Sequence, residues 1–347
     1  TLFRSVTIDY CPNVNPIVME YVLGNPENVD AQLLDAVIYA FVEINPDGTL
    51  YVPTPRFLRQ LVQLKLEKPA LQVIAAIGGW GTEGFSDAAA TPASRYNFAR
   101  EAKKLMNQYG LDGIDIDWEY PGSSAAGIKS SPQDRENFTL LITALRDVLG
   151  DDAWLSVAGT GDSAYIRNSA EINKIAPLIT YFNLMSYDFT AGETGENARK
   201  HQANLYPSDL SLPGYSVDDM VNNLIEAGMP SEKILLGVPL YGRLGATVTK
   251  SYDYLRKDYI NKNGYEIAFD KQAQVPYLVK DGKFAMSYDN ALSIFLKGQY
   301  VLRNCLGGIF AWTSTYDQAN ILAKYMYQSI YDPDALKSEL EQVFGQF

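Results

Sequence analysis

The sequence predicts an α/β fold, a (β/α)8 TIM barrel with a small α+β insertion between its seventh and eighth strands. Two observations predict the barrel: short apolar or β-branched runs recur eight times, and helical patterns separate most of them. The runs are nearly continuous in apolar character, which is typical of parallel strands that are buried on both faces. Eight such strands favour closure into a barrel over an open sheet.

The expected strands are short and lie at intervals that leave room for a helix. They cover residues 5–10, 36–42, 71–77, 113–117, 155–158, 179–185, 234–239 and 306–312. Helical patterns cover residues 132–149, 217–227 and 318–329, and a terminal helix is expected over 333–347, beneath the barrel.

The chain between the last two strands is much longer than one helix requires. Residues 265–269 and 274–279 resemble short strands beside the turn at 280–283. We therefore predict a catalytic barrel over residues 1–245 and 304–347. Residues 246–303 are predicted to form an α+β insertion that walls one side of a cleft.

Composition narrows the classes of function. The 347 residues include 41 acidic and 29 basic side chains, a net charge of -12 that disfavours binding to nucleic acid or to an anionic membrane. No apolar run approaches the roughly 18 residues of a membrane span, and no basic-then-apolar leader precedes the first predicted strand. We expect a soluble monomer from which any export signal is already absent.

Histidine and cysteine are scarce. The single His201 and the two cysteines, Cys11 and Cys305, are too few for a histidine zinc site or a four-cysteine cluster, so no metal or cofactor is expected. Cys11 follows the predicted first strand and Cys305 precedes the eighth, which puts them at opposite barrel ends, about 15 Å apart. That distance predicts two free thiols and leaves the redox compartment open.

The strand at 113–117 carries the strongest functional signal. Side chains alternate along a strand, so Asp115, Asp117 and Glu119 share the face that points into the barrel, while Trp118 points toward the helices. Burying three carboxyl groups is costly unless they share protons, and one of them is then held protonated as a general acid. Glu119, nearest the C-terminal mouth, is the expected proton donor. An edge strand with its acids in water and a site for a hard cation are the alternatives.

The segment DGIDIDWEYP at 112–121 resembles the signature of the glycoside hydrolase family 18 chitinases. Other segments resemble the family's strands in the expected order: YAF at 39–41, IGGW at 77–80, MSYD at 185–188, HQANLY at 201–206, GVPLYGR at 237–243 and GGIFAW at 307–312. The resemblance covers about residues 5–331 and implies a substrate of chitin or chito-oligosaccharides.

The resemblance implies a retaining mechanism in which the N-acetyl group of the substrate is the nucleophile. Glu119 would protonate the glycosidic oxygen, Asp117 would hold the acetamido N–H, and Asp115 would share a proton with Asp117. Tyr187 would donate a hydrogen bond to the acetamido carbonyl. The implied substrate-binding residues are Tyr10, Phe41, Gly79, Trp80, Met185, Asp188, Tyr241, Arg243 and Trp312.

Three of these binding residues have implied positions. Trp312 would form the floor under the sugar next to the cleaved bond, and Trp80 a stacking platform beyond it. Tyr10, at the end of the predicted first strand, would hydrogen-bond the inner aspartate, Asp115.

The sequence departs from the family in two places. Ala76 stands where the family often has a serine that holds the inner aspartate, and residues 189–193 lack the tryptophan that many members place there. A chitinase-like lectin and an endo-N-acetylglucosaminidase acting on N-glycans or peptidoglycan are the alternative functions. A secreted or cell-envelope location is expected.

Overall fold

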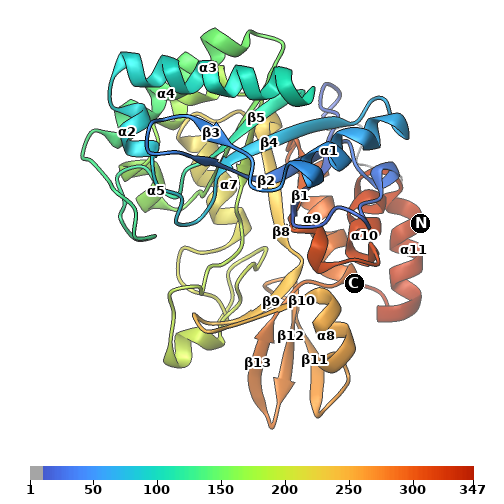
Figure 1. Ribbon diagram of the computed structural model, residues 1–347. Helices are drawn as coiled ribbons and strands as arrows, with labels where there is room; N and C mark the ends of the chain where they lie inside the picture. Colours follow the sequence, from blue (N-terminus) through green and yellow to red (C-terminus); the bar gives the residue numbers. More distant parts are fainter. Residues whose placement is uncertain (1–10) are drawn as a thin grey trace.

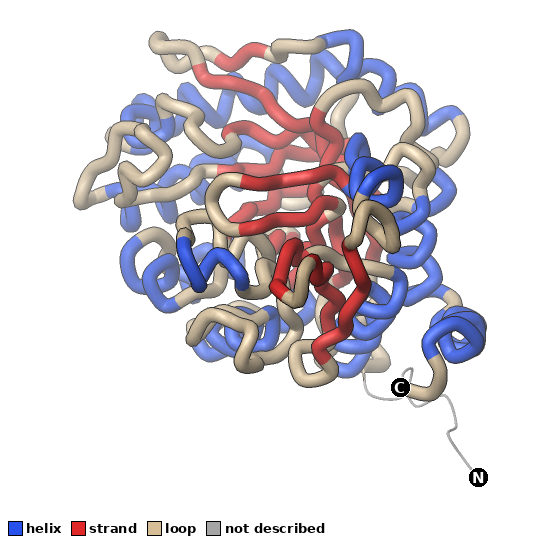
Figure 2. Tube along the Cα trace, turned by 90° about the horizontal axis from the view of Figure 1, so that it is seen from below, coloured by secondary structure: helices blue, strands red, loops and turns tan. Residues whose placement is uncertain are grey.

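The computed structural model describes residues 11–347 and contains a closed barrel of eight parallel strands. The barrel strands are β1 (Ile17–Leu23), β2 (Ala36–Ile44), β4 (Gln72–Gly78), β5 (Gly113–Asp117), β6 (Trp154–Gly159), β7 (Tyr181–Leu184), β8 (Ile234–Pro239) and β14 (Gly308–Trp312). Each pairs with its neighbours in chain order, and β1 closes the ring by pairing with both β2 and β14. The strands lie inside a ring of helices (Figure 2). The predicted fold class is confirmed.

The first strand differs from the prediction. It is Ile17–Leu23, and the predicted strand at 5–10 is wrong as the first barrel strand; those residues lie outside the described part of the chain. The segment IVMEYVL alternates correctly for a strand, since Met19 and Tyr21 face the barrel interior and Val18 and Val22 face the helices.

The prediction of two free thiols is also wrong, because Cys11 and Cys305 form a disulfide with their Cα atoms 5.5 Å apart. The error follows from the first strand. Cys11 precedes β1 rather than following the first strand, so it lies at the same end of the barrel as Cys305, which precedes β14. The disulfide ties the segment before β1 to the turn between α9 (Ala291–Arg303) and β14.

Helices cover the outside of the barrel (Figure 1). The remaining α-helices outside the insertion are α1 (Pro55–Gln63), α2 (Phe85–Ala89), α3 (Pro92–Tyr109), α4 (Asp134–Leu149), α5 (Ser163–Asn168), α6 (Ile172–Ile175), α7 (Val217–Glu226), α10 (Ile321–Tyr331) and α11 (Pro333–Phe344). Short 3-10 turns cover Ala31–Leu33, Leu64–Leu66, Ala176–Leu178, Gly195–Arg199, Ser231–Lys233 and Ser314–Tyr316. The helices predicted over 132–149, 217–227, 318–329 and 333–347 are confirmed. No helix within 11–347 is both long and apolar enough to cross a bilayer.

Trp118 anchors β5 to the surrounding helices. Its buried ring stacks on Phe85 of α2 at 5.3 Å between centroids and meets the edge of Phe138 of α4 at 5.7 Å. Aromatic burial of this size fixes the strand's rotation, because a rotated strand would expose the indole. The outward Trp118 therefore holds the acids of β5 toward the barrel axis.

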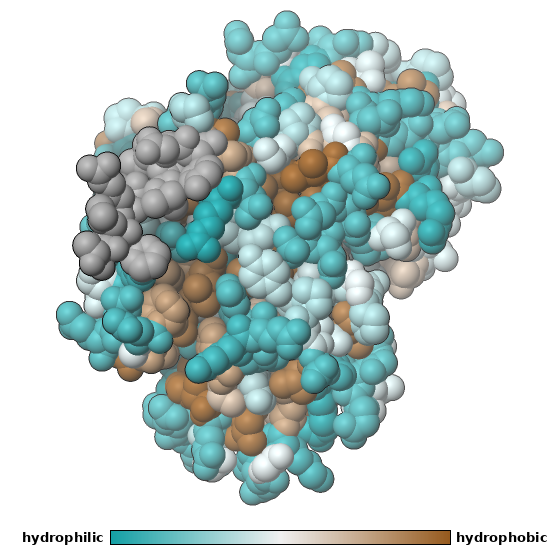
Figure 3. Space-filling model, turned by 180° about the vertical axis from the view of Figure 1, so that it is seen from behind, coloured by the Kyte–Doolittle hydropathy of each residue, from teal (hydrophilic) through white to brown (hydrophobic). Residues whose placement is uncertain are grey.

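The chain after β8 builds a second sheet. Its strands are β9 (Tyr241–Leu244), β10 (Val248–Ser251), β11 (Tyr265–Asp270), β12 (Val275–Lys280) and β13 (Lys283–Ser287), in the antiparallel order β10-β9-β13-β12-β11, with α8 (Tyr252–Asp258) after β10. They form a lobe below the barrel in Figure 1, and from behind its surface shows hydrophilic residues interspersed with hydrophobic patches (Figure 3). The hairpin strands expected at 265–269 and 274–279 are confirmed. A short strand, β3 (Leu50–Tyr51), pairs with β2.

Two features bear on the predicted insertion boundaries. The second sheet begins at Tyr241, while α9 packs against α10 and the barrel strands β8 and β14. The domain division at 246 and 303 stays a prediction.

The buried His201, on the loop after β7, bonds Asp270 of β11 through Nε2 at 2.9 Å, so the sole histidine fixes the lobe to a barrel loop.

Glu20 is an unusual residue for the outer face of β1. Its side chain is 1% exposed, and neither carboxyl oxygen has a hydrogen-bond partner within residues 11–347. Burial, together with the neighbouring carboxylates of Asp317 and Asp30, raises the pKa of Glu20 to about 8. Glu20 is therefore neutral in the folded protein at neutral pH.

This burial predicts a pH-dependent stability. In the unfolded chain Glu20 ionises near pH 4.5. The contribution of the protonated side chain to the free energy of unfolding is therefore fully present below pH 4.5 and is lost as the pH rises toward about 8. Between those values, wild type should lose stability relative to Glu20→Gln, by about 4 to 5 kcal/mol in the free energy of unfolding. Urea unfolding at a series of pH values measures this, with the exposed Glu226→Gln as control. Parallel pH curves for wild type and Glu20→Gln would contradict the assignment.

Candidate active site

Two acids of β5, Asp115 and Asp117, and Glu119 just after the strand lie in line along the inner face of the barrel. Asp115 and Asp117 are 0% and 3% exposed, and Glu119 follows directly at the C-terminal mouth, where it is partly exposed. The predicted direction of these side chains is confirmed, which removes the alternative of an edge strand with its acids in water.

Asp115 is fixed by three donors from other strands. The Tyr21 hydroxyl donates to Oδ2 at 2.7 Å, while the Ser156 hydroxyl and the Asn183 amide donate to Oδ1 at 2.7 and 3.2 Å. Burial raises the pKa of Asp115 to about 6, and these hydrogen bonds limit the rise because they stabilise the carboxylate.

Two expectations about Asp115 change in the structure. Tyr10 lies outside the described residues, and Tyr21 on β1 makes the bond that was predicted for a tyrosine of the first strand. Ala76 is the register neighbour of Asp115 on β4, whereas Ser156 is its neighbour on β6. The hydroxyl missing at Ala76 is thus supplied from the opposite side.

The upper two acids, Asp117 and Glu119, lie close enough to change each other's pKa. Burial raises the pKa of Asp117 well above its ordinary value, and the nearby carboxyl groups of Glu119 and Asp115 raise it further. Burial also raises the pKa of Glu119, to about 7, with Asp188 adding to the effect while a hydrogen bond with Asp117 opposes it. A carboxylic acid with this pKa, facing an open pocket, can donate a proton near neutral pH.

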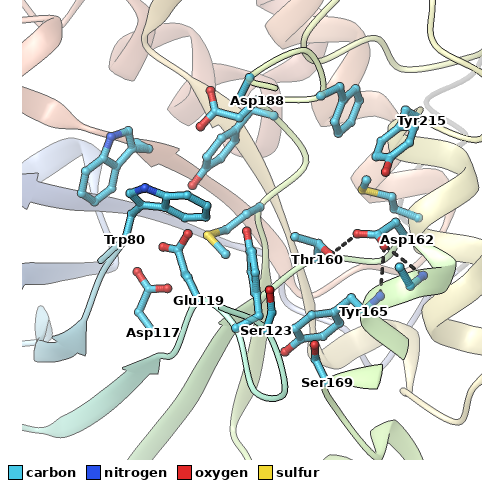
Figure 4. Close-up of a pocket in the computed structure, with 18 of the residues that line it drawn as sticks. Trp80, Asp117, Glu119, Ser123, Thr160, Asp162, Tyr165, Ser169, Asp188 and Tyr215 are labelled. Carbon is cyan, nitrogen blue, oxygen red and sulfur yellow. Dashed lines mark hydrogen bonds between the residues drawn. The ribbon is translucent and has the colours of Figure 1, made fainter. Parts of the chain in front are cut away.

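These acids open into one pocket of about 920 Å³ (Figure 4). The predicted site residues that line it are Phe41, Trp80, Asp117, Glu119, Met185, Tyr187, Asp188, Arg243 and Trp312. Asp115, Gly79 and Tyr241 do not line it and instead lie behind the residues that do. The structure thus brings together side chains of β2, β5, β9 and β14 with side chains of the segments that follow β4, β5 and β7.

Aromatic rings form part of the wall. Trp312 stacks on Phe41 with centroids 5.5 Å apart and contacts Tyr21 at 5.7 Å, whereas Trp80 is 62% exposed at the rim. Gly79 keeps this wall close, since a Cβ there would lie 2.6 Å from the Phe41 ring. Flat apolar surfaces of this kind are suited to the faces of sugar rings.

Asp188 and Arg243 form the opposite edge. Arg243 Nε donates to Asp188 Oδ1 at 2.9 Å, and the Tyr241 hydroxyl donates to the same oxygen at 2.6 Å. Tyr241 therefore positions Asp188 rather than lining the pocket itself.

Sequence reasoning missed part of the pocket. The residues that it did not predict include Tyr21, Tyr120, Ser123, Thr160, Asp162, Tyr165, Ser169 and Tyr215. Tyr120 could have been found, because it follows Glu119 directly. Thr160 and Asp162 follow β6 at the C-terminal end of the barrel, which is where functional loops are expected, but no motif marks them.

A family model for the glycosyl hydrolases family 18 matches residues 17–317, beginning at the first residue of β1. This chain belongs to that family. Chitinase A1 of Niallia circulans is 33% identical over 303 residues, which cover 76% of this chain and 43% of that protein. Chitotriosidase-1 of Mus musculus is 29% identical over 342 residues, covering 89% of this chain and 72% of that protein. The chain thus spans less than half the length of the first relative.

Solved structures of the family are similar along nearly the whole chain. The chitinase domain of the spore coat protein CotE from Clostridium difficile is 75% identical, with a TM-score of 0.75, and the alignment covers 99% of this chain and 100% of that one. A family 18 N-acetylglucosaminidase from Paenibacillus barengoltzii is 32% identical with a TM-score of 0.82, covering 91% of this chain and 100% of that one.

Ser156 yields a test of the network around Asp115. Ser156→Ala removes a donor to the carboxylate and leaves the Trp154 Nε1–H, which donates to Ser156 at 3.0 Å, without its acceptor. The pKa of Asp115 should rise by about one unit, as expected for loss of one hydrogen bond to a charged group. The acidic limb of the plot of kcat/KM against pH should move to higher pH by a similar amount.

Ser156→Thr, which keeps the hydroxyl, is the matched control and should retain the wild-type limb. An unchanged acidic limb in Ser156→Ala would show that this bond does not tune the site.

Proposed function

We propose that this chain hydrolyses β-1,4-linked N-acetylglucosamine in chitin or chito-oligosaccharides, with retention of configuration and with Glu119 as the general acid/base. The observation that carries the proposal is the pocket-facing Glu119, whose pKa is raised to about 7 above a buried Asp117. Membership of a glycoside hydrolase family and the names of the relatives support the substrate class.

In the first step Glu119 donates its proton to the glycosidic oxygen as the bond to the anomeric carbon breaks. The acetamido carbonyl oxygen of the same sugar bonds to that carbon from the opposite face, and the leaving sugar departs with a free hydroxyl. The product is a cyclic oxazolinium ion, and no second enzymic carboxylate attacks the sugar.

Asp117 and Tyr187 would hydrogen-bond the acetamido group of the reacting sugar. Asp117 Oδ1 is buried without a hydrogen-bond partner among the described residues, so it is available to the acetamido N–H. Tyr187 lines the same pocket and would donate to the carbonyl oxygen. Both contacts strengthen as charge develops on the ring, which makes them stabilising in the transition state.

In the second step the Glu119 carboxylate takes a proton from water, whose oxygen adds to the anomeric carbon and reopens the acetamide. Two inversions give net retention, and Glu119 regains its proton. Trp312 and Phe41 would support the sugar that reacts, and Trp80, Met185, Asp188 and Arg243 would shape the neighbouring positions.

We also propose a secreted or cell-envelope location. The disulfide between Cys11 and Cys305 supports it, because disulfides persist mainly in oxidising compartments. The monomeric state stays a prediction.

Glu119→Gln tests the chemical role. The amide keeps the shape of the side chain but cannot supply a proton. The rate of fluorophore release from a chitotriose conjugate should therefore fall by about 100- to 10,000-fold. Binding of chito-oligosaccharides should persist, and Glu226→Gln on the exposed face of α7 is the control. Equal rates in wild type and Glu119→Gln would contradict the proposal, and binding without cleavage by wild type would favour the lectin alternative.

The pH profile tests the same residue independently. Because the pKa of Glu119 is raised to about 7 and the acid form is required, the alkaline limb of the kcat/KM profile should begin only near pH 7. The measurement is kcat/KM for the chitotriose conjugate across the pH range at constant ionic strength. A decline that begins near pH 4.5, the ordinary glutamate value, would contradict the raised pKa.

A further inference from the structure

The pocket continues past Glu119 into a polar recess. We call it the aglycon bay, and its residues are Ser123, Thr160, Asp162, Tyr165, Ser169 and Tyr215. In Figure 4, Glu119 lies between Asp117 on one side and Asp162 with Tyr215 on the other. Since Asp117 serves the sugar that keeps the acetamide, the bay lies on the side that receives the leaving group.

Asp162 is held rigidly in this bay. Its Oδ1 accepts hydrogen bonds from the backbone N–H groups of Ala164 and Tyr165, both at 3.0 Å, as the N-cap of α5. Its Oδ2 accepts from the Thr160 hydroxyl. A carboxylate fixed in this way keeps its position when a ligand arrives, which lowers the cost of binding.

Few basic side chains line the pocket. Arg243 is the single basic residue among the described residues that line it, and its guanidinium is already engaged by Asp188 and the carbonyl of Gly245. Four carboxyl groups line the same space: Asp117, Glu119, Asp162 and Asp188. The pKa values of Asp117 and Glu119 are raised, and Arg243 balances Asp188. The carboxylate of Asp162, which pairs with no basic residue of the described lining, is therefore the one that favours a ligand with positive charge.

Tyr215 lies half-buried beside Asp162 and adds an aromatic ring to the bay. The faces of such rings attract ammonium groups. Tyr165 shapes the bay without bonding a ligand, because its hydroxyl is enclosed by protein against Gly159.

We infer that the aglycon bay recognises a leaving sugar with a free amine, so that partially deacetylated chitin is a preferred substrate. The inference rests on the proposed function, which requires an acetyl group only on the sugar that reacts. Beyond the cleaved bond an ammonium group gains a charge-assisted hydrogen bond to Asp162, whereas an acetamide gains only a neutral donor. The loop at 189–193 provides no tryptophan platform that would favour the acetylated sugar.

The test is cleavage of partially deacetylated chitosan at mildly acidic pH, followed by sequencing of the product ends by mass spectrometry. The new reducing ends report the sugar that reacts, and the first two sugars at the new non-reducing ends report the occupants of the leaving side. Wild type should enrich glucosamine at the new non-reducing ends. Asp162→Asn, which retains the helix cap but not the charge, should lower that preference about tenfold.

Asp281→Asn, in the exposed turn between β12 and β13, makes the same change in net charge and should leave the preference at the wild-type value. The thermal unfolding midpoint of each variant shows that it is folded. Equal end compositions for wild type and Asp162→Asn, with acetylated reducing ends, would overturn the inference alone. Free amines at the new reducing ends, or no products at all, would overturn the proposed function and the inference with it.

Discussion

The burial of Asp115 and Asp117 on the inner face of β5, directly below Glu119, is the constraint on which the rest of the site depends. Water cannot solvate Asp115 and Asp117, so their charge must be removed by protons or stabilised by donors. The barrel supplies donors at the bottom of the row, from Tyr21, Ser156 and Asn183, and none of them reaches the top.

The number of hydrogen-bond donors decreases from Asp115 toward Glu119, and this difference gives the acids different pKa values. Asp115, with three donors, has the smaller rise in pKa, to about 6, while Asp117 has its pKa raised much further by burial and by its neighbours. Glu119 meets the pocket with a pKa near 7. A proton is thus held at the upper end of the row, next to the space where a glycosidic oxygen would lie.

The outer face of β5 is equally important. Trp118 between Phe85 and Phe138 prevents the strand from rotating, and Gly78 allows the neighbouring strand to approach, since a Cβ there would lie 2.0 Å from the carbonyl oxygen of Asp117. Packing under the helices thereby sets the direction of the acidic row inside the barrel.

The sequence predicted the fold and the acidic row because both depend on local periodicity. It failed at β1, where IVMEYVL contains Glu20 in a buried position and so lacks the continuous apolar character of the other strands. That single error displaced Cys11 to the wrong end of the barrel and assigned the bond of Tyr21 to Tyr10. Ser156 was missed because its bond to Asp115 joins residues far apart in the chain, which periodicity does not report. Asp162 bonds only to its own loop, and its place in the pocket depends on how the barrel brings that loop beside the loops of other strands.

The central claim is that the acetamido group of the substrate, rather than a second enzymic carboxylate, attacks the anomeric carbon. The most direct measurement is kcat/KM for chitobiose conjugates whose reacting acetamide carries an increasing number of fluorine atoms. Fluorine withdraws electrons from the carbonyl oxygen, so the logarithm of kcat/KM should fall steadily with each atom added. Rates that do not change across the series would contradict the claim.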